Sequence, residues 1–392
     1  MALPGDAVIN TALIASPRGT FNLNTANFQG SRVYESIYDN NNLVEIDVFD
    51  TDDAIGNLII QGDEFINLSF NAPGTPPLNY VCCLDKIQQI SITGTQKGRY
   101  YTIFGVGQET FMSKFNYVQK SYNTDIASMV KDVHTNYLHS NKSLNSEQTE
   151  GQQQLVIPNL KPFDAIELMR TRAVSSTNPS STFLYFENSA GMNFRTIEGM
   201  FKTPSVKTFY RSDTVASSVY NNSDYNNIIS WDVPQYLTST EKITLGGLKQ
   251  RVATFDARTR QYSNNDVFPP YVIASQFFRN LYGGNFGMFN YIPIDTTKSP
   301  TYISQMTPYQ LGFISELIQS YLNIKVNGDT TYKAGDVITL YIPQPVSITN
   351  LPVLDPIFSG QYVISRICRN IGKLQEKPRY IDNIECISIS IV

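Results

Sequence analysis

Gly62-Asp63-Glu64-Phe65-Ile66-Asn67-Leu68 and Gly335-Asp336-Val337-Ile338-Thr339-Leu340 follow one pattern, and this repetition is the strongest indication of the fold. In both stretches a Gly-Asp turn precedes alternating apolar and polar residues, which is typical of a half-buried strand. A second strand-like run follows each copy and begins at Tyr80-Val81 or at Tyr362-Val363. We therefore predict one small β-unit that is used twice. Because Gly-Asp often precedes a strand, two unrelated turn–strand units remain the alternative.

Two copies of one unit per chain would allow three subunits to form a ring of six similar units. Such a ring has the symmetry needed to join a threefold object to a sixfold one. We predict that the strands at 62–70 and 335–342 form barrel walls, and we expect subunit interfaces among them. The candidate interface residues are Phe65, Ile66, Leu68, Val337, Ile338 and Leu340.

The composition favours a β-rich protein with large polar surfaces. The chain has 392 residues, which is enough for two to four domains. Charged residues make up 16% and aromatic residues 12%, with 24 Tyr and 22 Phe. Tyr suits interfaces because its ring is apolar and its hydroxyl can stay solvated. The net charge of −4 and the lack of a basic run argue against a nucleic-acid-binding surface.

Targeting signals and cysteine usage both favour a protein made in a reducing cytoplasm. The sequence has no 18-residue apolar stretch, so we expect no membrane span. Residues 1–6 lack the charged and apolar regions of a signal peptide. Cys82, Cys83, Cys368 and Cys386 lie in strand-like runs without metal-ligand spacing, and we predict buried free thiols. The adjacent Cys82 and Cys83 should point to opposite faces of their strand.

Residues 1–118 are predicted to be all β, as a first small antiparallel barrel or sandwich. A hairpin loop at 94–98 separates the last two strands of this region. The predicted strands are 43–49, 58–60, 65–70, 80–87, 90–93 and 100–104.

Residues 119–225 change character and predict an α+β domain. Apolar residues at helical spacing predict a helix over 123–138, with Asn123 or Thr124 as its cap. A second helix should begin at Pro162, since proline suits the first helical turn. The runs at 183–188 and 192–197 predict a hairpin.

The second β-unit is predicted to be split by an insertion. Strand character returns within 226–258, gives way to a helical region over 259–322, and resumes over 323–392. The helix predicted at 307–322 should be capped by Thr307 and should bury Leu311, Ile314 and Ile318. The predicted fold class is α+β and mainly β, with two similar antiparallel β-barrels and an α+β domain that lies between them and is inserted into the second.

The sequence offers no catalytic, metal-binding or cofactor-binding residues. His134 and His139 are five apart on a predicted helix, which places them on different faces, and we expect surface histidines. Glu167 and Glu187 lie in ordered segments, but helix-surface and strand-end charges explain them as well as a carboxylate pair would. No nucleophile, phosphate-loop or dinucleotide motif is present in the sequence.

Several runs resemble the baseplate hub proteins of contractile-tailed phages of the T-even type. The resemblance covers most of residues 160–392 and agrees with that family in motif order and total length. The matching runs are Lys161–Met169, Phe183–Asn188, Gly191–Ile197, Gly246–Tyr262, Lys325–Asp329, Gly335–Pro343 and Gly360–Ile364.

The resemblance implies a structural protein rather than an enzyme. Members of that family form homotrimers with two similar tube domains per chain, which gives a pseudo-sixfold ring. The implied partners are a central spike protein on a separate chain, tail tube or tube-initiator proteins, the tape measure protein and other baseplate proteins. DNA would pass through the lumen without specific binding, which suits a mildly acidic chain. The implied location is the tail baseplate of a virion assembled in the host cytoplasm, with no membrane and no cofactor.

Two other classes of function stay open from the sequence. One is a tail-associated cell-wall hydrolase, a glycosidase or peptidase, although few histidines and no nucleophile motif argue against most enzymes. The other is a β-rich carbohydrate-binding tail protein that would use exposed aromatic side chains. The paired β-units favour the hub, because a lectin needs no split second barrel.

Overall fold

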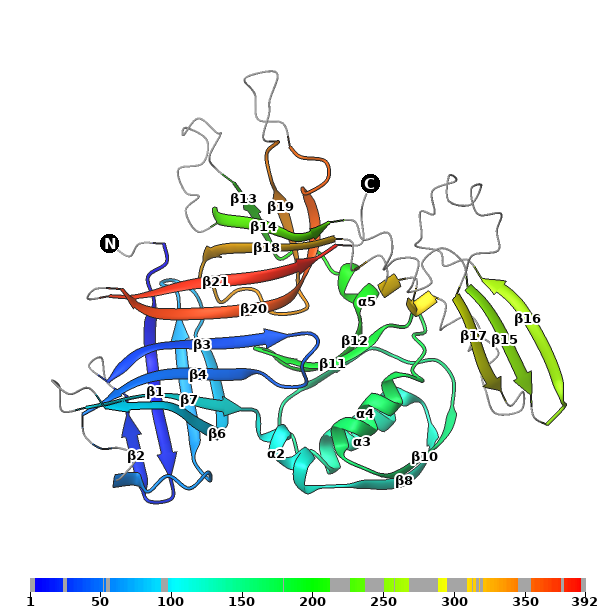
Figure 1. Ribbon diagram of the computed structural model, residues 1–392, viewed down its shortest axis with the longest axis horizontal. Coiled ribbons are helices and arrows are strands. Elements are labelled where there is room, and N and C mark those ends of the chain that lie inside the picture. The colour runs from blue at the N-terminus through cyan, green and yellow to red at the C-terminus, as the bar shows by residue number, and fades with distance from the viewer. Residues whose placement is uncertain are drawn as a thin grey trace.

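The computed structural model describes most of the chain, and strands dominate it (Figure 1). The described residues are 4–23, 27–51, 53, 57–92, 98–178, 180–211, 226–236, 250–256, 258–267, 288–294, 309–311, 313–314, 317, 320–344, 354–374 and 377–388.

Two β-units contribute the thirteen strands of one large sheet. The first unit consists of β1 (Val8–Ser16), β2 (Gly19–Asn22), β3 (Phe28–Ser36), β4 (Leu43–Asp50), β5 (Phe65–Asn71), β6 (Leu78–Ile92) and β7 (Arg99–Val106). The second unit consists of β13 (Lys207–Tyr210), β14 (Ile228–Tyr236), β18 (Ser320–Asn327), β19 (Val337–Tyr341), β20 (Gly360–Leu374) and β21 (Lys377–Ile387).

The two units are joined edge to edge, so the sheet runs through both without a break. The strand order is β14-β18-β21-β20-β3-β4-β7-β6-β5-β1-β2, with β19 paired to β20 and β13 paired to β19. The junction is the antiparallel pairing of β20 with β3, from Arg366 opposite Ser36 to Gly372 opposite Gly30. In Figure 1 the red strands β20 and β21 lie directly beside the blue strands β3 and β4.

Both units have the same strand order, which confirms the predicted repeat. The first unit runs β3-β4-β7-β6-β5 and the second runs β14-β18-β21-β20-β19, with antiparallel pairing throughout. The equivalent strands β6 and β20 each have 15 residues. The Gly-Asp turns lie at equivalent places, immediately before β5 and β19.

The register of the two units also agrees around one bulge, although β6 has a further bulge between Gln88 and Ser91 that β20 lacks. A bulge between Leu84 and Lys86 on β6 recurs between Ile364 and Arg366 on β20. In each unit, the residue before that bulge donates its backbone amide to a carbonyl in the turn before the neighbouring strand. The Leu84 amide bonds to the Glu64 carbonyl, and the Ile364 amide bonds to the Asp336 carbonyl, both at 2.9 Å. Such shared irregularities are strong evidence of one repeated unit, since bulges are specific structural features.

A second bulge is shared by β3 and β14, which occupy the same position in the strand orders of the two units. It falls between Phe28 and Gly30 on β3 and between Ile228 and Ser230 on β14. These two bulges fix which residues are equivalent, and β14 corresponds to β3 as β20 corresponds to β6.

The apolar cores lie on one face of the large sheet. The core of the first unit contains Ile46, Leu68 and Ile103 and also includes Ile371 and Tyr380 from the second unit. The core of the second unit is built around residues such as Ile324, Ile338 and Ile364. Alternation along the strands explains this arrangement, because every second side chain points to the same face.

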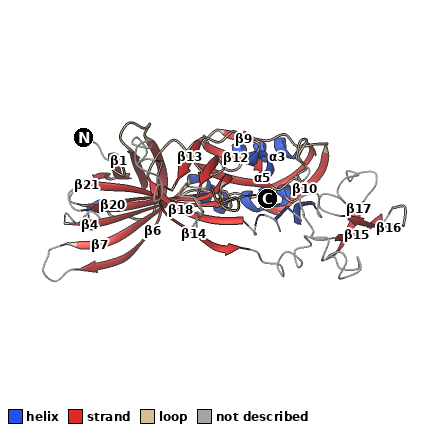
Figure 2. Ribbon diagram, turned by 90° about the horizontal axis from the view of Figure 1, so that it is seen from above, coloured by secondary structure: helices blue, strands red, loops and turns tan. Residues whose placement is uncertain are grey.

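The α+β domain lies beside the sheet, with its helices gathered together (Figure 2). As predicted, one helix begins at Pro162 and the strands at 183–188 and 191–196 form a hairpin. The first predicted helix is shorter than expected, and Asp125 caps it instead of Asn123 or Thr124. The elements are α2 (Gln108–Phe115), β8 (Val118–Thr124), α3 (Ile126–Asn136), β9 (Leu144–Ser146), β10 (Gln153–Leu160), α4 (Pro162–Arg170), β11 (Phe183–Asn188), β12 (Gly191–Thr196) and α5 (Ile197–Phe201).

A separate three-stranded sheet has the order β16-β15-β17. It consists of β15 (Gln250–Asp256), β16 (Gln261–Val267) and β17 (Met288–Ile294). The strand predicted at 252–255 is therefore present, but it pairs with β16 and β17 rather than with β14 or β18.

Two predicted elements were wrong in part. Residues 57–59 form a helical turn where a strand was predicted over 58–60. The helix predicted over 307–322 is helical at 309–311, 313–314 and 317, but β18 begins at Ser320, while Thr307 lies outside the described residues. Its buried residues are Phe313 and Leu317, whereas Leu311 and Ile314 are half-buried and Ile318 lies outside the described side chains. The helix was predicted to extend too far because apolar residues at helical spacing continue into β18.

Candidate functional site

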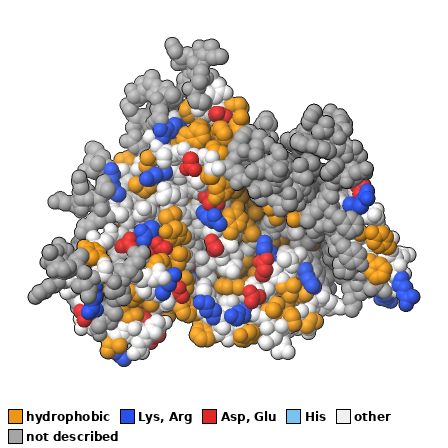
Figure 3. All heavy atoms as spheres, in the orientation of Figure 1, with side chains coloured by type: hydrophobic (Ala, Val, Ile, Leu, Met, Phe, Trp, Pro, Cys, Tyr) orange, Lys and Arg blue, Asp and Glu red, His pale blue; other side chains and the backbone are white. Residues whose placement is uncertain are grey.

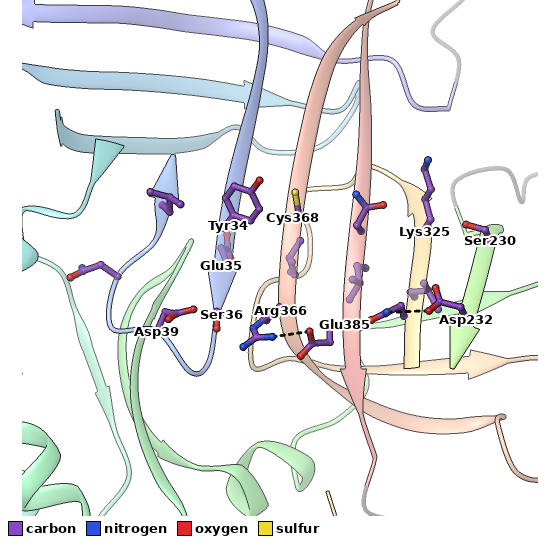
Figure 4. A pocket seen from close by; sticks show the side chains of 17 residues that line it. Tyr34, Glu35, Ser36, Asp39, Ser230, Asp232, Lys325, Arg366, Cys368 and Glu385 are labelled. Carbon is purple, nitrogen blue, oxygen red and sulfur yellow. Dashed lines mark hydrogen bonds and ion pairs between the residues drawn. The ribbon is translucent and has the colours of Figure 1, made fainter. Parts of the chain in front are cut away.

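The exposed face of the sheet forms a concave pocket of about 780 Å³ over the junction between the two units. Six strands from the two units contribute to it, and Figure 4 shows their side chains along the face. The lining residues are Tyr34, Glu35, Ser36, Asp39, Asn41, Leu43, Ser230, Asp232, Asn323, Ile324, Lys325, Arg366, Ile367, Cys368, Asn383, Ile384 and Glu385.

Polar pairs connect neighbouring strands across this face. Arg366 on β20 lies 3.1 Å from Glu385 on β21, and the Asn323 amide donates to Asp232 at 3.3 Å. Further along the sheet, Arg32 contacts Glu45 at 2.6 Å. These pairs are partly exposed, so each contributes at most about 1 kcal/mol. Their main effect is to leave a polar surface with balanced charges.

A buried charged cluster lies on the opposite face of the same strands. The Arg369 side chain on β20 is fully buried, and its Nε lies 3.3 Å from Glu35 Oε1 on β3. The guanidinium also donates to the carbonyl of Asp329 at 2.9 Å and to the hydroxyl of Tyr380 at 2.8 Å. A buried arginine is tolerated only when it is paired and hydrogen-bonded, as here.

Glu35 connects the cluster to both units. Its Oε1 accepts the Tyr80 hydroxyl of the first unit at 2.7 Å, and its Oε2 accepts the Ala334 amide of the second unit at 3.2 Å. The junction of the two units is therefore held by a charged network beneath the strand pairing.

Asp382 on β21 completes the cluster. Its Oδ2 accepts the Tyr332 hydroxyl at 2.6 Å and the Asp329 amide at 3.2 Å, and it lies 3.8 Å from Arg369. Its Oδ1 has no hydrogen-bond partner. Burial raises the pKa of Asp382 to about 6, although the Arg369 charge opposes that shift.

A second ionic cluster joins the first unit to the α+β domain. Lys142 contacts Glu109 at 2.8 Å and Glu187 at 2.7 Å. The Asn41 amide donates to the same two carboxylates, at 3.1 and 2.8 Å. Burial acts to raise the pKa of Glu109, but the ion pair with Lys142 keeps that pKa below its ordinary value. This cluster is a structural anchor, because its charges contact one another.

The candidate interface residues named from the sequence lie in β5 and β19. Phe65 is 46% exposed, whereas Ile66 and Leu68 are buried in the core of the first unit. Ile338 and Leu340 lie in the core of the second unit, and Val337 lies in a core that joins this unit to the α+β domain. The structure therefore distributes five of the six residues among three cores, leaves Phe65 exposed, and does not bring them together.

The junction residues Arg369, Glu35 and Asp382 were missed by the sequence analysis. A signal for them exists, because each is a charged residue at an inward-facing position of an alternating strand. Arg369, for example, lies between the buried Ile367 and Ile371.

The described residues show no catalytic arrangement. His134 is buried, and its ring nitrogens lie 3.0 Å from the Tyr185 hydroxyl and 3.0 Å from the Lys142 carbonyl. The expected surface position was therefore wrong for His134, but it is correct for His139. Glu167 pairs with Arg170 on its own helix, and Glu187 belongs to the ionic cluster around Lys142. Within the described ranges, no group of His, Cys, Asp or Glu could hold a metal ion.

The cysteines and helices agree largely with the sequence predictions. All four cysteines are free, with Cys82 and Cys386 buried but Cys83 and Cys368 only half-buried. Among the helices that the structure describes, none is both long and apolar enough to cross a membrane.

Comparison with solved structures shows that the fold is similar to that of tail proteins, including one from a prophage. The tail protein from Neisseria meningitidis MC58 matches with a TM-score of 0.59 at 6% identity, over 96% of each chain. The 43 kDa tail protein of prophage MuSo2 from Shewanella oneidensis matches with a TM-score of 0.56 at 8% identity, over 97% of this chain and 98% of that one. At such identities the likeness is one of fold, and it extends over nearly the whole chain. No protein-family model and no curated protein matches the sequence.

Proposed function

We propose that this protein is a structural baseplate hub of a contractile phage tail. Three copies form a pseudo-sixfold ring that joins the hexameric tail tube to the trimeric central spike. The ring encloses the passage for the tape measure protein and DNA. We also propose the domain division drawn from the sequence, with tube domains at 1–118 and at 226–258 plus 323–392. The α+β domain then comprises 119–225 and 259–322. The strand pairing adds β13 to the second tube domain and places β15 in a separate sheet.

The observation that carries this proposal is the repeated β-unit. Two units with the same strand order and the same bulges lie in one sheet, joined edge to edge. A chain with two equivalent units can present threefold symmetry to one partner and near-sixfold symmetry to another. The shared fold of the two tail proteins is consistent with this role.

The polar face of the sheet suits the wall of a passage. We assign it to the lumen because the apolar cores already cover the opposite face. Charges such as those of Arg32 and Arg366 are paired with carboxylates on the neighbouring strand, and Figure 3 shows acidic and basic side chains interspersed on the face it displays. Without a basic stripe the surface would release few counterions from DNA, so DNA would pass without being held.

The partners proposed are those of a hub. They are a central spike protein on a separate chain, tube or tube-initiator proteins, the tape measure protein and other baseplate proteins. The proposed location is the tail baseplate of the virion, after assembly in the host cytoplasm. The described residues contain no arrangement that favours an enzyme.

Light scattering of the purified chain over a dilution series tests the ring. The expected result is a species near 132 kDa, three times the chain mass of 44.1 kDa. A monomer at every concentration would contradict the ring and favour the hydrolase or the glycan-binding protein. Turnover of cell-wall material or binding of host glycan would then be the next assays.

A further inference from the structure

The strand β20 has two parts with different neighbours on one edge. Its first part, at 360–363, pairs with β19 of its own unit. Its second part, at 366–372, pairs with β3 of the other unit. The opposite edge of β20 pairs with β21 along most of its length. The second part of β20 is thus the place where one unit receives the next.

The equivalent strand β6 has the same two parts, but one neighbour is missing. Its first part, at 78–83, pairs with β5, and its opposite edge pairs with β7. Beyond Leu84, whose amide bonds to the Glu64 carbonyl, residues 85–92 have no strand on the first edge within the described part of the chain. The position that β3 occupies beside β20 is therefore open beside β6.

The strand β14 is equivalent to β3 and is also open on one edge. It pairs with β18, and from Ser230 onward no described strand lies on its other side. It contains Pro234, a residue that sheets tolerate on edge strands. An uncovered edge strand tends to pair with another chain, and folded proteins normally block such edges.

We propose that β14 of one copy of this chain pairs with residues 85–92 of β6 in the next copy, as β3 pairs with β20 inside each chain. This inference rests on the proposed ring and specifies its subunit contact. The contact is head to tail, since the two surfaces differ and each chain carries one of each. Repetition of one junction type then builds the ring.

The internal junction also gives the register of the contact. Inside the chain Cys368 lies opposite Tyr34, and Asn370 lies opposite Arg32. The shared strand pairings make Gln88 equivalent to Cys368 and Ser91 equivalent to Asn370. They likewise make Gln235 equivalent to Tyr34 and Asp232 equivalent to Arg32.

Between copies, Gln88 therefore lies opposite Gln235, and Ser91 lies opposite Asp232. Both Ser91 and Asp232 are exposed in the single chain, as residues at an unformed contact should be.

The two edges are not paired within one chain, because six other strands lie between them. In the order β14-β18-β21-β20-β3-β4-β7-β6, seven strand spacings separate β14 from β6. At about 4.8 Å per spacing the two edges lie roughly 34 Å apart along the sheet. A bond between them must therefore join different copies.

Disulfide trapping in the full-length chain tests the register. The variant Ser91→Cys/Asp232→Cys places thiols at positions predicted to face each other, and a disulfide requires Cα atoms about 4.4–6.8 Å apart. The matched control is Ser91→Cys/Asn323→Cys, because Asn323 lies opposite Asp232 on the next strand and one spacing further from the contact. Each single variant measures the background from the four native thiols. Each sample is oxidised at a protein concentration at which light scattering detects the assembled species. The products are then analysed under denaturing, non-reducing conditions.

The expected result is covalent dimers and trimers of Ser91→Cys/Asp232→Cys, at least tenfold more abundant than in the control. Equal cross-linking of the two double variants would overturn the register. Covalent dimers of Asp232→Cys alone would show β14 facing β14 and would overturn the head-to-tail contact. A stable trimer by light scattering without cross-links would overturn the strand pairing but leave the proposed ring intact. A monomer without cross-links would overturn both.

Discussion

Arg369 and Arg366 lie three residues apart on β20, but they have opposite environments. Arg366 is half-exposed and pairs with Glu385, whereas Arg369 is fully buried among Glu35, Asp382 and the tyrosines. The bulge after Ile364 and the alternation beyond it set which arginine points inward. One strand thus carries a surface charge and a core charge with very different energetic consequences.

Replacing Arg369 by Leu should destabilise the protein by about 3–5 kcal/mol, because it leaves buried carboxylates without a counter-charge. Arg366→Leu removes a partly exposed ion pair and should cost no more than about 1 kcal/mol. Urea unfolding followed by fluorescence measures both. Adding Glu35→Gln to Arg369→Leu should recover part of the loss, because it removes one unpaired charge. Equal losses for the two arginine variants would contradict the assigned environments.

Asp382 should make stability depend on pH between about 4 and about 6. Its pKa is raised to about 6 in the folded protein, compared with about 3.9 in an unfolded chain. The folded state therefore binds this proton more tightly, so its contribution to stability is complete below about pH 4. That contribution is lost as pH rises through about 6. Arg369 stays charged throughout this range and cannot cause the change.

The isosteric variant Asp382→Asn isolates this effect. The free energy of unfolding of the wild type should fall relative to that of the variant by about 2 kcal/mol between pH 4 and pH 6.5. The comparison cancels the titration of carboxyls common to both proteins, such as Glu109, whose lowered pKa acts in the opposite direction. Parallel stability profiles for the two proteins would refute a titrating Asp382.

At the scale of elements, the helical residues between β17 and β18 connect the α+β domain to the second unit. Phe313 is fully buried in a core that also contains Leu184, Phe186 and Met200, while Ile314 is half-buried. The sequence predicted the helical stripe, but the stripe alone cannot show which of its sides meets a neighbouring domain.

Phe313→Ala should therefore cost about 3–5 kcal/mol through the cavity it leaves. Ile314→Ala should cost less than half as much, because part of that side chain is already exposed. Thermal unfolding measured by circular dichroism distinguishes the two variants. A larger loss for Ile314→Ala would restore the burial predicted from the sequence.

The strands were largely predictable, and the sheet that they form was not. Alternation predicted the strands at 43–49 and 65–70 because each buries one face of the sheet. The pairing of β3 with β20 joins residues more than 300 positions apart, and no local pattern encodes it. The buried cluster was missed for the same reason. Glu35 and Arg369 can be recognised as an ion pair only when their two strands are known to be neighbours.

At the scale of the whole molecule, the repeat predicted from two Gly-Asp turns proved to be the organising feature. The sequence anticipated two similar units, and the structure adds that they share one sheet with matching bulges. The internal junction contains the buried Arg369–Glu35 pair. The equivalent positions on β6 and β14 are 89–90 and 236, where the sequence has no charged residue. The junction inside the chain and the proposed contact between chains therefore differ in chemistry although they share a geometry.

Covalent linkage of the two units changes how their junction responds to dilution. The pairing of β3 with β20 forms within one polypeptide, so its strands meet at an effective concentration set by the chain rather than by the solution. The translational entropy lost when separate molecules associate does not weigh against this junction. Dilution can therefore separate one copy of the protein from another, but it leaves each pair of units closed.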